Sequence, residues 1–406
     1  MKQKFNIIDL FAGCGGLLDG FEANPHFRSL ASVEWESMPC QTLRRRLQEK
    51  WHHKNAEAEV VRFDIQRTEE LFNGFNDSEY GSHKGLDFLV GDKKIDVIIG
   101  GPPCQAYSLA GRIRDPNGMR NDYRNYLFES YIKVLRHYRP KFFVFENVVG
   151  LLSASPDGTP IRDVIAKAFD EAGYKIIEDI SKAVFNVADF GVPQQRKRII
   201  LFGVQKELYC NHRDIINKFY CDYLVLEKKK ARTVRDAIGD LPRFFPLKKA
   251  IRQNKLHLSH AMSESQIANH IPRFHNERDI STFQLLAKDI EDGRFKYTSI
   301  ESLKKLYTKL TGRKSNIHKY YVLRWNEQSN TIPAHLHKDG MRHIHPDSKQ
   351  ARTITVREAA RLQSFDDDFV FLGSQSDQYK MIGNAVPPDF SKAIANAVYK
   401  TLVEVV

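Results

Sequence analysis

The chain has 406 residues, of which 42% are hydrophobic and 28% are charged, and its formal net charge is +12. This length and composition exclude a disordered chain and predict one large domain accompanied by a smaller one. The sequence contains neither an uninterrupted apolar run of about 18 residues nor a signal-peptide cleavage pattern, so we expect a soluble, cytoplasmic protein.

The positive charge is concentrated in one segment. Residues 204–350 contain 28 Lys and Arg against 16 Asp and Glu, a net of +12, whereas the rest of the chain contains 34 of each kind. Because Lys and Arg drive nucleic-acid association by neutralising phosphates, this distribution predicts a neutral catalytic domain joined to a polyanion-binding domain. A basic surface that serves only solubility is the alternative.

The cysteines and histidines do not predict a metal centre. The five cysteines form no Cys-x-x-Cys pair and are odd in number, which argues against a disulfide framework and a structural zinc site and favours a reducing compartment. The pairs His335-x-His337 and His343-x-His345 lack an accompanying cluster of cysteines or carboxylates. We therefore expect no metal.

The first predicted strand covers residues 6–10 and leads into a glycine cluster, after which an amphipathic pattern predicts a helix. Gly13, Gly15 and Gly16 suit a turn where a cofactor passes close to the backbone, because glycine lacks Cβ and tolerates positive φ. The third glycine of a dinucleotide fingerprint would fall at Leu18, so the match is incomplete. A tight turn without a ligand is the alternative.

Two carboxylates follow the next predicted strands. Glu34 ends the strand predicted at residues 29–33, at about the distance from the glycines where a carboxylate takes ribose hydroxyls. Trp35 beside it could cover an adenine ring, and Asp64, after the apolar run of residues 60–63, could accept from an adenine amino group. Taken singly, such residues are more often surface carboxylates or core aromatics.

The sharpest motif is Pro102-Pro103-Cys104-Gln105, which follows the strand predicted at residues 95–99. Ligands of doubly wound folds bind at the carboxyl edge of the sheet, and the two prolines restrict how the cysteine is presented there. An inert buried cysteine is the usual alternative, but the polar residues that follow Cys104 make burial unfavourable. The motif therefore predicts a nucleophilic thiol.

Acid and base side chains accompany two later strands. The strand predicted at residues 141–145 leads into Glu146, which brings a potential proton donor to the same edge. Gln194, Arg196 and Arg198 alternate beside the strand predicted at residues 198–204, so we expect them to share one face. Two guanidinium groups on one face can hold a carbonyl oxygen or a phosphate, and a solvated basic edge is the alternative.

The succession of elements predicts the domain organisation. A further strand is predicted at residues 174–180 and helices at residues 125–139 and 161–172, and this alternation favours a parallel, doubly wound sheet. We place a discontinuous catalytic and cofactor-binding domain at residues 1–230 plus 351–406. The smaller domain, where the periodicity is weak, is placed at residues 231–350.

Six segments, in order, resemble the DNA cytosine-5 methyltransferase family of the bacterial restriction-modification type. Residues 9–16 are similar to its first cofactor motif, residues 102–105 to its nucleophile loop, residues 146–148 to its base-binding Glu-Asn-Val, residues 194–198 to its Gln-x-Arg-x-Arg motif, residues 352–363 to the helix that supports its recognition domain, and residues 383–386 to its last cofactor motif. The resemblance covers residues 5 to about 240 and 351 to the end. The family usually has Ser at the position of Ala385.

The resemblance implies an α/β fold in which a doubly wound, Rossmann-like, S-adenosylmethionine-dependent methyltransferase domain carries a second, smaller DNA-recognition domain. It implies that S-adenosylmethionine is bound by Phe11, Ala12, Gly13, Cys14, Gly15, Gly16, Leu17, Glu34, Trp35, Asp64, Ile65, Pro102, Asn384 and Val386. It implies catalysis by Cys104, Glu146, Arg196 and Arg198, and contacts to double-stranded DNA by Gln105, Ser108, Arg112 and Gln194. A monomer with a cognate restriction endonuclease as its functional partner is expected.

The implied mechanism begins with activation of the pyrimidine ring, since cytosine C5 is a poor nucleophile. We expect the Cys104 thiolate to add to C6 of a flipped-out cytosine while Glu146 donates or shares a proton at N3. Arg198, supported by Arg196, is expected to steady the ring oxygen O2. C5 then takes the methyl group, and loss of the C5 proton with elimination of the cysteine restores the aromatic ring.

Three alternatives stay open. Amino-directed DNA methyltransferases carry Asp or Asn before Pro-Pro and an aromatic residue after it, whereas this chain has Gly101 and Cys104. An RNA-directed branch of the same family methylates tRNA, and the long basic segment favours duplex DNA without excluding RNA. A catalytically silent DNA-binding regulator would not need the complete set of predicted catalytic residues.

Overall fold

The computed structural model describes residues 4–103, 127–155, 158–253, 256–261, 267–314, 320–338 and 340–405. The chain packs into two compact units. The first consists of Met1–Gly191, Arg196–Lys230 and Ala385–Val406, and the second of Val192–Gln195 and Ala231–Asn384. Residues 351–384, which the sequence analysis groups with the catalytic domain, pack within the second unit. The assignment of the two units to cofactor binding and to DNA recognition stays a prediction.

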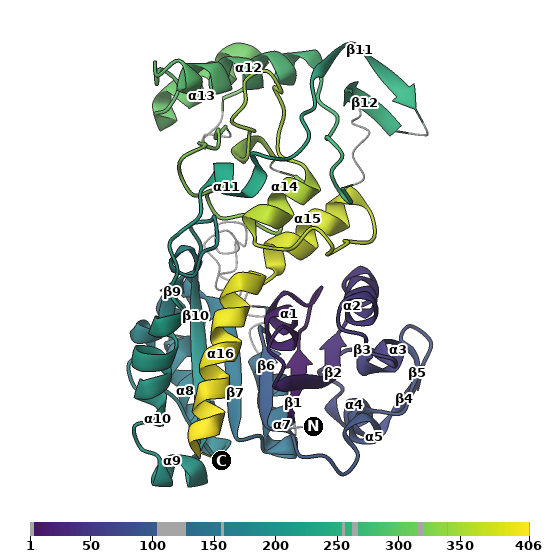
Figure 1. The fold of residues 1–406 in the computed structure, drawn as a ribbon, viewed down its shortest axis with the longest axis vertical. Helices are drawn as coiled ribbons and strands as arrows, with labels where there is room; N and C mark the ends of the chain where they lie inside the picture. Colours follow the sequence, from purple (N-terminus) through teal and green to yellow (C-terminus); the bar gives the residue numbers. More distant parts are fainter. Residues whose placement is uncertain are drawn as a thin grey trace. The chain divides into compact units, whose positions relative to one another are not determined.

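Among the described residues, the first unit contains an eight-stranded sheet whose order is β3-β2-β1-β6-β7-β10-β8, with β9 paired to β10 (Figure 1). Its strands are β1 (Phe5–Leu10), β2 (Phe27–Glu34), β3 (Val60–Arg62), β6 (Val97–Gly100), β7 (Phe142–Val148), β8 (Tyr174–Lys175), β9 (Val184–Asn186) and β10 (Lys197–Gln205). A separate hairpin is formed by β4 (Phe75–Asp77) and β5 (Gly81–His83).

The sheet is mixed rather than parallel throughout. The pairs β1–β2, β2–β3, β1–β6 and β6–β7 are parallel, whereas β10 runs antiparallel to β7, β8 and β9. Only β10 therefore runs against the other strands, and the expectation of a parallel sheet is wrong at the three pairings that β10 makes. Because β10 starts beside the end of β7, its first residues lie at the carboxyl edge where β7 ends.

Helices cover both faces of this sheet. Phe143 of β7 stacks on Phe169 of helix α8, whereas Phe142, which points to the opposite face, contacts Phe202, and Phe202 stacks on Phe219. The helices of this unit are α1 (Gly16–Glu22), α2 (Ser37–Glu49), α3 (Ala56–Glu59), α4 (Thr68–Asn73), α5 (Leu86–Val90), α7 (Leu127–Tyr138), α8 (Ile161–Glu171), α9 (Lys206–Asn211), α10 (Ile215–Asn217) and α16 (Pro388–Val405). The predicted doubly wound α/β class is confirmed.

The last helix returns to the start of the fold. The Ser391 hydroxyl of α16 donates a hydrogen bond to the Leu17 carbonyl of α1. A Cβ atom at Gly20 would lie 2.4 Å from the Lys392 nitrogen, so only glycine permits this close approach of the two helices. The chain terminus thereby supports the helix that follows the glycine loop.

The second unit contains the helices α11 (Val234–Ile238), α12 (Glu277–Glu291), α13 (Ile300–Thr311), α14 (Val356–Leu362) and α15 (Gln375–Asn384), and the strands β11 (Pro246–Gln253) and β12 (Leu256–His260). Helices α12 and α13 were not predicted, because only weak periodicity was found in this region of the sequence. Their apolar faces share a core in which Phe283, Leu286 and Leu306 are buried around Ile344. None of the helices in the described ranges is long and apolar enough to cross a membrane.

Candidate active site

Several strands of the first unit end side by side at one sheet edge. Leu10 pairs with Val33 and with Gly100, and Gly100 pairs with Phe145. The residues that follow these positions, including Phe11, Glu34 and Glu146, therefore emerge next to one another. This register gathers the predicted site from segments more than 100 residues apart in sequence.

The loop after β1 has the backbone conformation that its glycines predict. Gly13 and Gly15 have φ values of 55° and 93°, and Phe11 also has a positive φ of 58°. A Cβ atom at Gly15 would lie 2.5 Å from Leu43 Cδ1, whereas one at Gly13 would meet no atom within 4 Å. The positive φ of Gly15 therefore favours glycine there, and Gly13 leaves the loop open for a ligand to approach the backbone.

Glu34 is bound to this loop at the end of β2. Its Oε2 accepts a hydrogen bond from Gly13 N at 2.9 Å, and its Oε1 accepts from Trp35 N at 2.9 Å and Glu36 N at 2.8 Å. Burial raises the pKa of Glu34, and these N–H groups act in the opposite direction. Trp35 is 49% exposed, so its indole ring is free to cover a planar ligand.

The other residues predicted to bind the cofactor differ in exposure. Asp64 lies just beyond β3, where its Oδ1 accepts from Gln66 N at 3.0 Å. The remaining ones in this part of the unit are buried, namely Ala12, Cys14, Gly16, Leu17 and Ile65. Burial raises the pKa of the Cys14 and Cys40 thiols to about 12, so neither supplies a thiolate at neutral pH.

Glu146 and Arg198 form an ion pair at the same edge. Arg198 Nε lies 2.9 Å from Glu146 Oε1, and the two side chains are only 14% and 12% exposed. Burial lowers the pKa of Arg198, and the opposing effect of the Glu146 carboxylate offsets only part of this shift. A Cβ atom at Gly101 would lie 2.7 Å from Glu146 Oε2, so glycine is needed where the chain passes this carboxylate.

The prediction that the three residues of the Gln-x-Arg-x-Arg motif share one strand face is wrong for Gln194, which belongs to the second unit. Arg196 and Arg198 lie in the first unit, and both interact electrostatically with Glu146. Strand β10 begins only at Lys197, because Gln195 N donates instead to Ser329 O in the second unit. Gln194 is fully buried there, and its amide bonds the side chain of Gln363.

Arg196 lies in the first unit but away from solvent. It is 2% exposed, its Nη2 donates to Ala385 O at 3.2 Å, and burial lowers the pKa of its guanidinium well below the usual value. Arg196 therefore holds the backbone that follows helix α15, whereas Arg198 holds the Glu146 carboxylate.

Two supporting residues were not identified from the sequence. The Tyr131 hydroxyl of α7 lies 3.1 Å from both Ile98 O and Val144 O, and so ties β6 to β7 just before Pro102 and Glu146 emerge. Asn147 Nδ2 donates to Pro102 O at 3.4 Å. From the sequence, Asn147 was named only as part of the Glu-Asn-Val motif, and no contact was predicted for it. Nothing in the sequence distinguishes Tyr131 from other apolar positions of the amphipathic helix α7, so its hydrogen bonds could not be predicted.

Residues 5–400 of the chain match the C-5 cytosine-specific DNA methylase family. The chain belongs to this family. The resemblance deduced from the six motifs and the predicted enzyme class, a DNA cytosine-5 methyltransferase, are confirmed.

The similarity of this methylase to its relatives extends over nearly its whole length. It is 35% identical to the type II methyltransferase M.Bpa9945I of Bacillus paralicheniformis, over 97% of this chain and 98% of that one. It is 32% identical to the type II methyltransferase M1.HphI of Haemophilus parahaemolyticus, over 98% of this chain and 87% of that one. Both relatives are type II methyltransferases.

Solved structures show the same fold. A DNA modification methyltransferase encoded within a prophage of E. coli superposes with a TM-score of 0.61 at 24% identity, covering 98% of this chain and 100% of that one. The Dnmt2 methyltransferase of S. pombe gives a TM-score of 0.52 at 13% identity, covering 99% of each chain.

Several predicted residues of this methylase lie outside the described residues, namely Cys104, Gln105, Ser108 and Arg112. The last two cofactor residues fall on either side of the unit boundary. Asn384 is the exposed final residue of α15 in the second unit, and Val386 is 6% exposed in the first unit. Pro102 is buried at the end of β6, where Asn147 holds its carbonyl.

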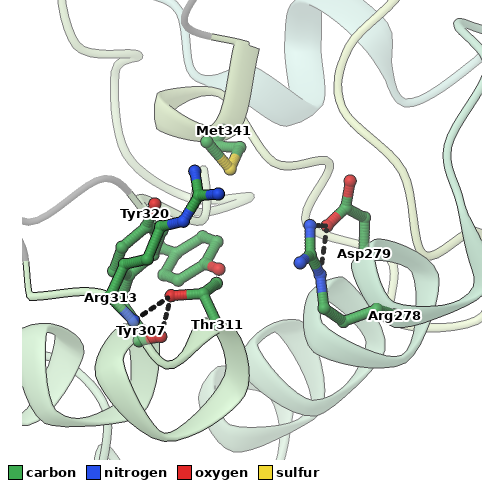
Figure 2. Close-up of a pocket in the computed structure, with 7 residues that line it drawn as sticks. All are labelled: Arg278, Asp279, Tyr307, Thr311, Arg313, Tyr320 and Met341. Atoms are coloured by element: carbon green, nitrogen blue, oxygen red, sulfur yellow. Dashed lines mark hydrogen bonds and ion pairs between the residues drawn. The ribbon is translucent and has the colours of Figure 1, made fainter.

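A cavity of about 310 Å³ in the second unit was not predicted from the sequence. It is lined by Arg278, Asp279, Tyr307, Thr311, Arg313, Tyr320 and Met341 (Figure 2). Arg278 is already paired with Asp279 at 3.1 Å, so much of the positive charge at the cavity is neutralised. The described part of the chain contains no cluster of three or more potential metal ligands.

Proposed function

We propose that the protein transfers a methyl group from S-adenosylmethionine to C5 of a cytosine in a specific sequence of double-stranded DNA. It would act in the cytoplasm as the modification enzyme that accompanies a restriction endonuclease. The observation that carries the proposal is the Glu146–Arg198 ion pair, which lies at the sheet edge where Pro102 emerges from β6. A carboxyl group that carries a proton and a guanidinium at one point match the acceptor atoms N3 and O2, which lie side by side on cytosine.

The residues around the glycine loop fit S-adenosylmethionine. The open space at Gly13, the anchored carboxylate of Glu34 and the half-exposed ring of Trp35 supply a backbone approach, a hydroxyl acceptor and a stacking surface. Asp64 would accept from the adenine amino group, and Pro102, Asn384 and Val386 would complete the enclosure. When bound, S-adenosylmethionine supplies an electrophilic methyl group on a sulfonium centre.

The catalytic residues then have distinct tasks. The Cys104 thiolate forms a bond to C6 of the flipped base, and the electron pair of the C5–C6 double bond becomes available at C5. Glu146 donates or shares a proton at N3, and Arg198 positions this carboxylate and steadies O2. After methylation the C5 proton leaves, the sulfur–C6 bond breaks and the double bond is restored.

Two predicted residues act indirectly in this proposal. Arg196 holds the main chain at Ala385 and so positions the neighbouring Val386. Gln194, whose amide is buried within the second unit, would support the arrangement of that unit rather than contact DNA directly.

The decisive experiment measures labelled methyl incorporation and covalent trapping. Sequencing of modified cytosines in DNA from cells that express the protein first identifies the target. We expect the wild-type enzyme to methylate that duplex and to form a permanent adduct with the same duplex carrying 5-fluorocytosine at the target position.

The Cys104→Ala variant should lose both methylation and adduct formation while still binding S-adenosylmethionine. Cys210→Ala is the matched control, because Cys210 is an exposed cysteine in the first unit and should be dispensable. Full turnover of the Cys104→Ala variant would refute the nucleophile. Methylation of tRNA in preference to duplex DNA would refute the substrate.

A further inference from the structure

The β11–β12 hairpin of the second unit carries an unusual charge pattern. Residues 241–261 contain five Lys and Arg and no Asp or Glu. Of these, Lys248, Lys249 and Arg252 belong to β11, and all three are exposed. Strand β11 therefore carries three positive charges and no negative charge.

Among the described residues, the cations of β11 make no ion pair, whereas some other exposed cations of the same unit do. Lys305 lies 2.6 Å from Glu301, and Arg324 lies 3.0 Å from Glu327. Within the described residues, Lys248, Lys249 and Arg252 make no ion pair. A cluster of like charges without acidic neighbours repels itself, and an anionic partner relieves that repulsion.

The geometry of β11 directs these side chains outward. Pro246 pairs with His260 and Ile251 with Leu258, so five steps along β11 are matched by only two steps along β12. The surplus residues form a wide bulge that contains both lysines, and bulges of this kind re-aim side chains. Lys248 through Arg252 is consequently an unbroken exposed run.

The base of the hairpin is anchored, so the cationic strand is held in a defined place. Leu258, Ser259 and His260 of β12 are at most 4% exposed. His260 Nε2 lies 2.8 Å from Gln350 O, and His275 N donates to Ser259 Oγ at 2.9 Å. A rigid support reduces the entropy that is lost when the exposed strand binds a partner.

We propose that β11 is a DNA-binding edge in which Lys248, Lys249 and Arg252 neutralise phosphates of the duplex. This inference rests on the proposed function, because it takes duplex DNA as the partner. A two-stranded ribbon has the dimensions to lie in the major groove, where its flanking cations reach the backbone on either side. Lysines on an exposed strand also prevent unwanted pairing between sheets, but that role alone would leave DNA binding unaffected.

The test compares the salt dependence of DNA binding in two triple variants. Lys248→Gln, Lys249→Gln and Arg252→Gln together remove three charges from β11. The control variant, Lys54→Gln, Lys93→Gln and Lys94→Gln, removes three exposed charges from the first unit, where Lys93 and Lys94 precede β6 at the sheet edge opposite the proposed site. The two variants therefore have the same net charge.

The β11 variant should flatten the plot of log affinity against log salt by about 2.7, since each lost phosphate contact contributes about 0.9. It should bind the target duplex at least tenfold more weakly at about 0.1 M salt, whereas the control should keep the wild-type slope. Melting curves and S-adenosylmethionine binding confirm folding. If the triple variant does not fold, each single variant should lower the slope by about 0.9.

The outcomes separate this inference from the proposed function. If the wild-type protein methylates DNA and the β11 variants keep its salt dependence, the role of β11 is refuted and the proposed function stands. If β11 and control variants flatten the slope equally, the effect is one of net charge and the inference is likewise refuted. A wild-type protein that neither binds nor methylates DNA would overturn both proposals.

Discussion

Two Arg–Glu pairs, one in each unit, differ in how completely their hydrogen bonds are satisfied. In the second unit, Arg352 binds Glu358 through two contacts of 2.7 Å, and the side chains are 0% and 1% exposed. Its remaining donors bind Gln350 Oε1 and Thr353 O, while Thr355 N donates to Glu358 Oε2. Burial alone would raise the pKa of Glu358, but Arg352 together with His345 and His270 outweighs it and lowers that pKa.

In the Arg198–Glu146 pair of the first unit, Arg198 Nε lies 2.9 Å from Glu146 Oε1, and Arg198 Nη1 donates to Lys197 O at 2.8 Å. Within the described residues no hydrogen bond reaches Glu146 Oε2, beside which Gly101 contributes no side chain. When protein groups use every hydrogen-bond donor and acceptor of an ion pair, the pair can only support the structure. When one carboxylate oxygen accepts no hydrogen bond from the protein, that oxygen can bind a substrate. We expect this difference to separate a structural pair from a catalytic one.

The strongest way to break this comparison is Glu146→Gln. We expect turnover to fall by about 10²- to 10⁴-fold, because the neutral amide cannot supply the proton at N3. The free energy of unfolding should change by only about 1 kcal/mol, since the pair lies at a partly open edge. Single-turnover methylation and denaturant unfolding measure the two quantities, and a rate within a few-fold of wild type would contradict the catalytic assignment.

Glu358→Gln should show the opposite behaviour. Removal of this carboxylate leaves Arg352 buried and unpaired, so we expect the unfolding free energy to drop by about 3 to 5 kcal/mol. Addition of Arg352→Leu removes the stranded charge and should recover part of the loss. Denaturant unfolding of the single and double variants checks this order, and a loss below about 1 kcal/mol in the single variant would show that the pair is not structural.

The residues that the sequence located correctly depend on local pattern. Glu34 and Glu146 were placed at the sheet edge because each lies at the end of an apolar strand, and the strand ends are observed there. Such features need only neighbouring residues to define them.

The features that the sequence did not locate depend on distant partners. The burial of Gln194 is set by contacts with Ser329 and Gln363, more than 130 residues away, and the direction of β10 by its antiparallel pairing with β7. Period-2 alternation over residues 194–198 was a valid local signal, but the pairing of Gln195 with the second unit delays the start of the strand. Helix α12 does carry helical spacing at Phe283, Leu286 and Ala287, which a stricter search for periodicity would have found.

The smallest expected effect concerns pH and sharpens the contrast between the units. Burial, together with His260 and Arg273, lowers the pKa of His275 in the second unit to about 3. In the first unit burial alone would lower the pKa of His53, but Glu22 and Glu59 raise it to about 9. A histidine with a lowered folded pKa costs stability as the pH falls below the unfolded value of about 6.5, whereas His53 loses its contribution as the pH rises through about 9.

His275→Gln should therefore reduce the loss of stability between about pH 7.5 and pH 5.5 by about 1 kcal/mol, because an unfolded histidine takes up a proton in this range and the buried one does not. His257→Gln is the matched control, since His257 is exposed on β12 of the same unit and should leave the acid sensitivity unchanged. Denaturant unfolding at the two pH values measures the effect. Equal pH dependence in the wild type and the His275 variant would mean that His275 takes up its proton equally in the folded and unfolded chain, and the acid sensitivity of the second unit would then have to come from other groups.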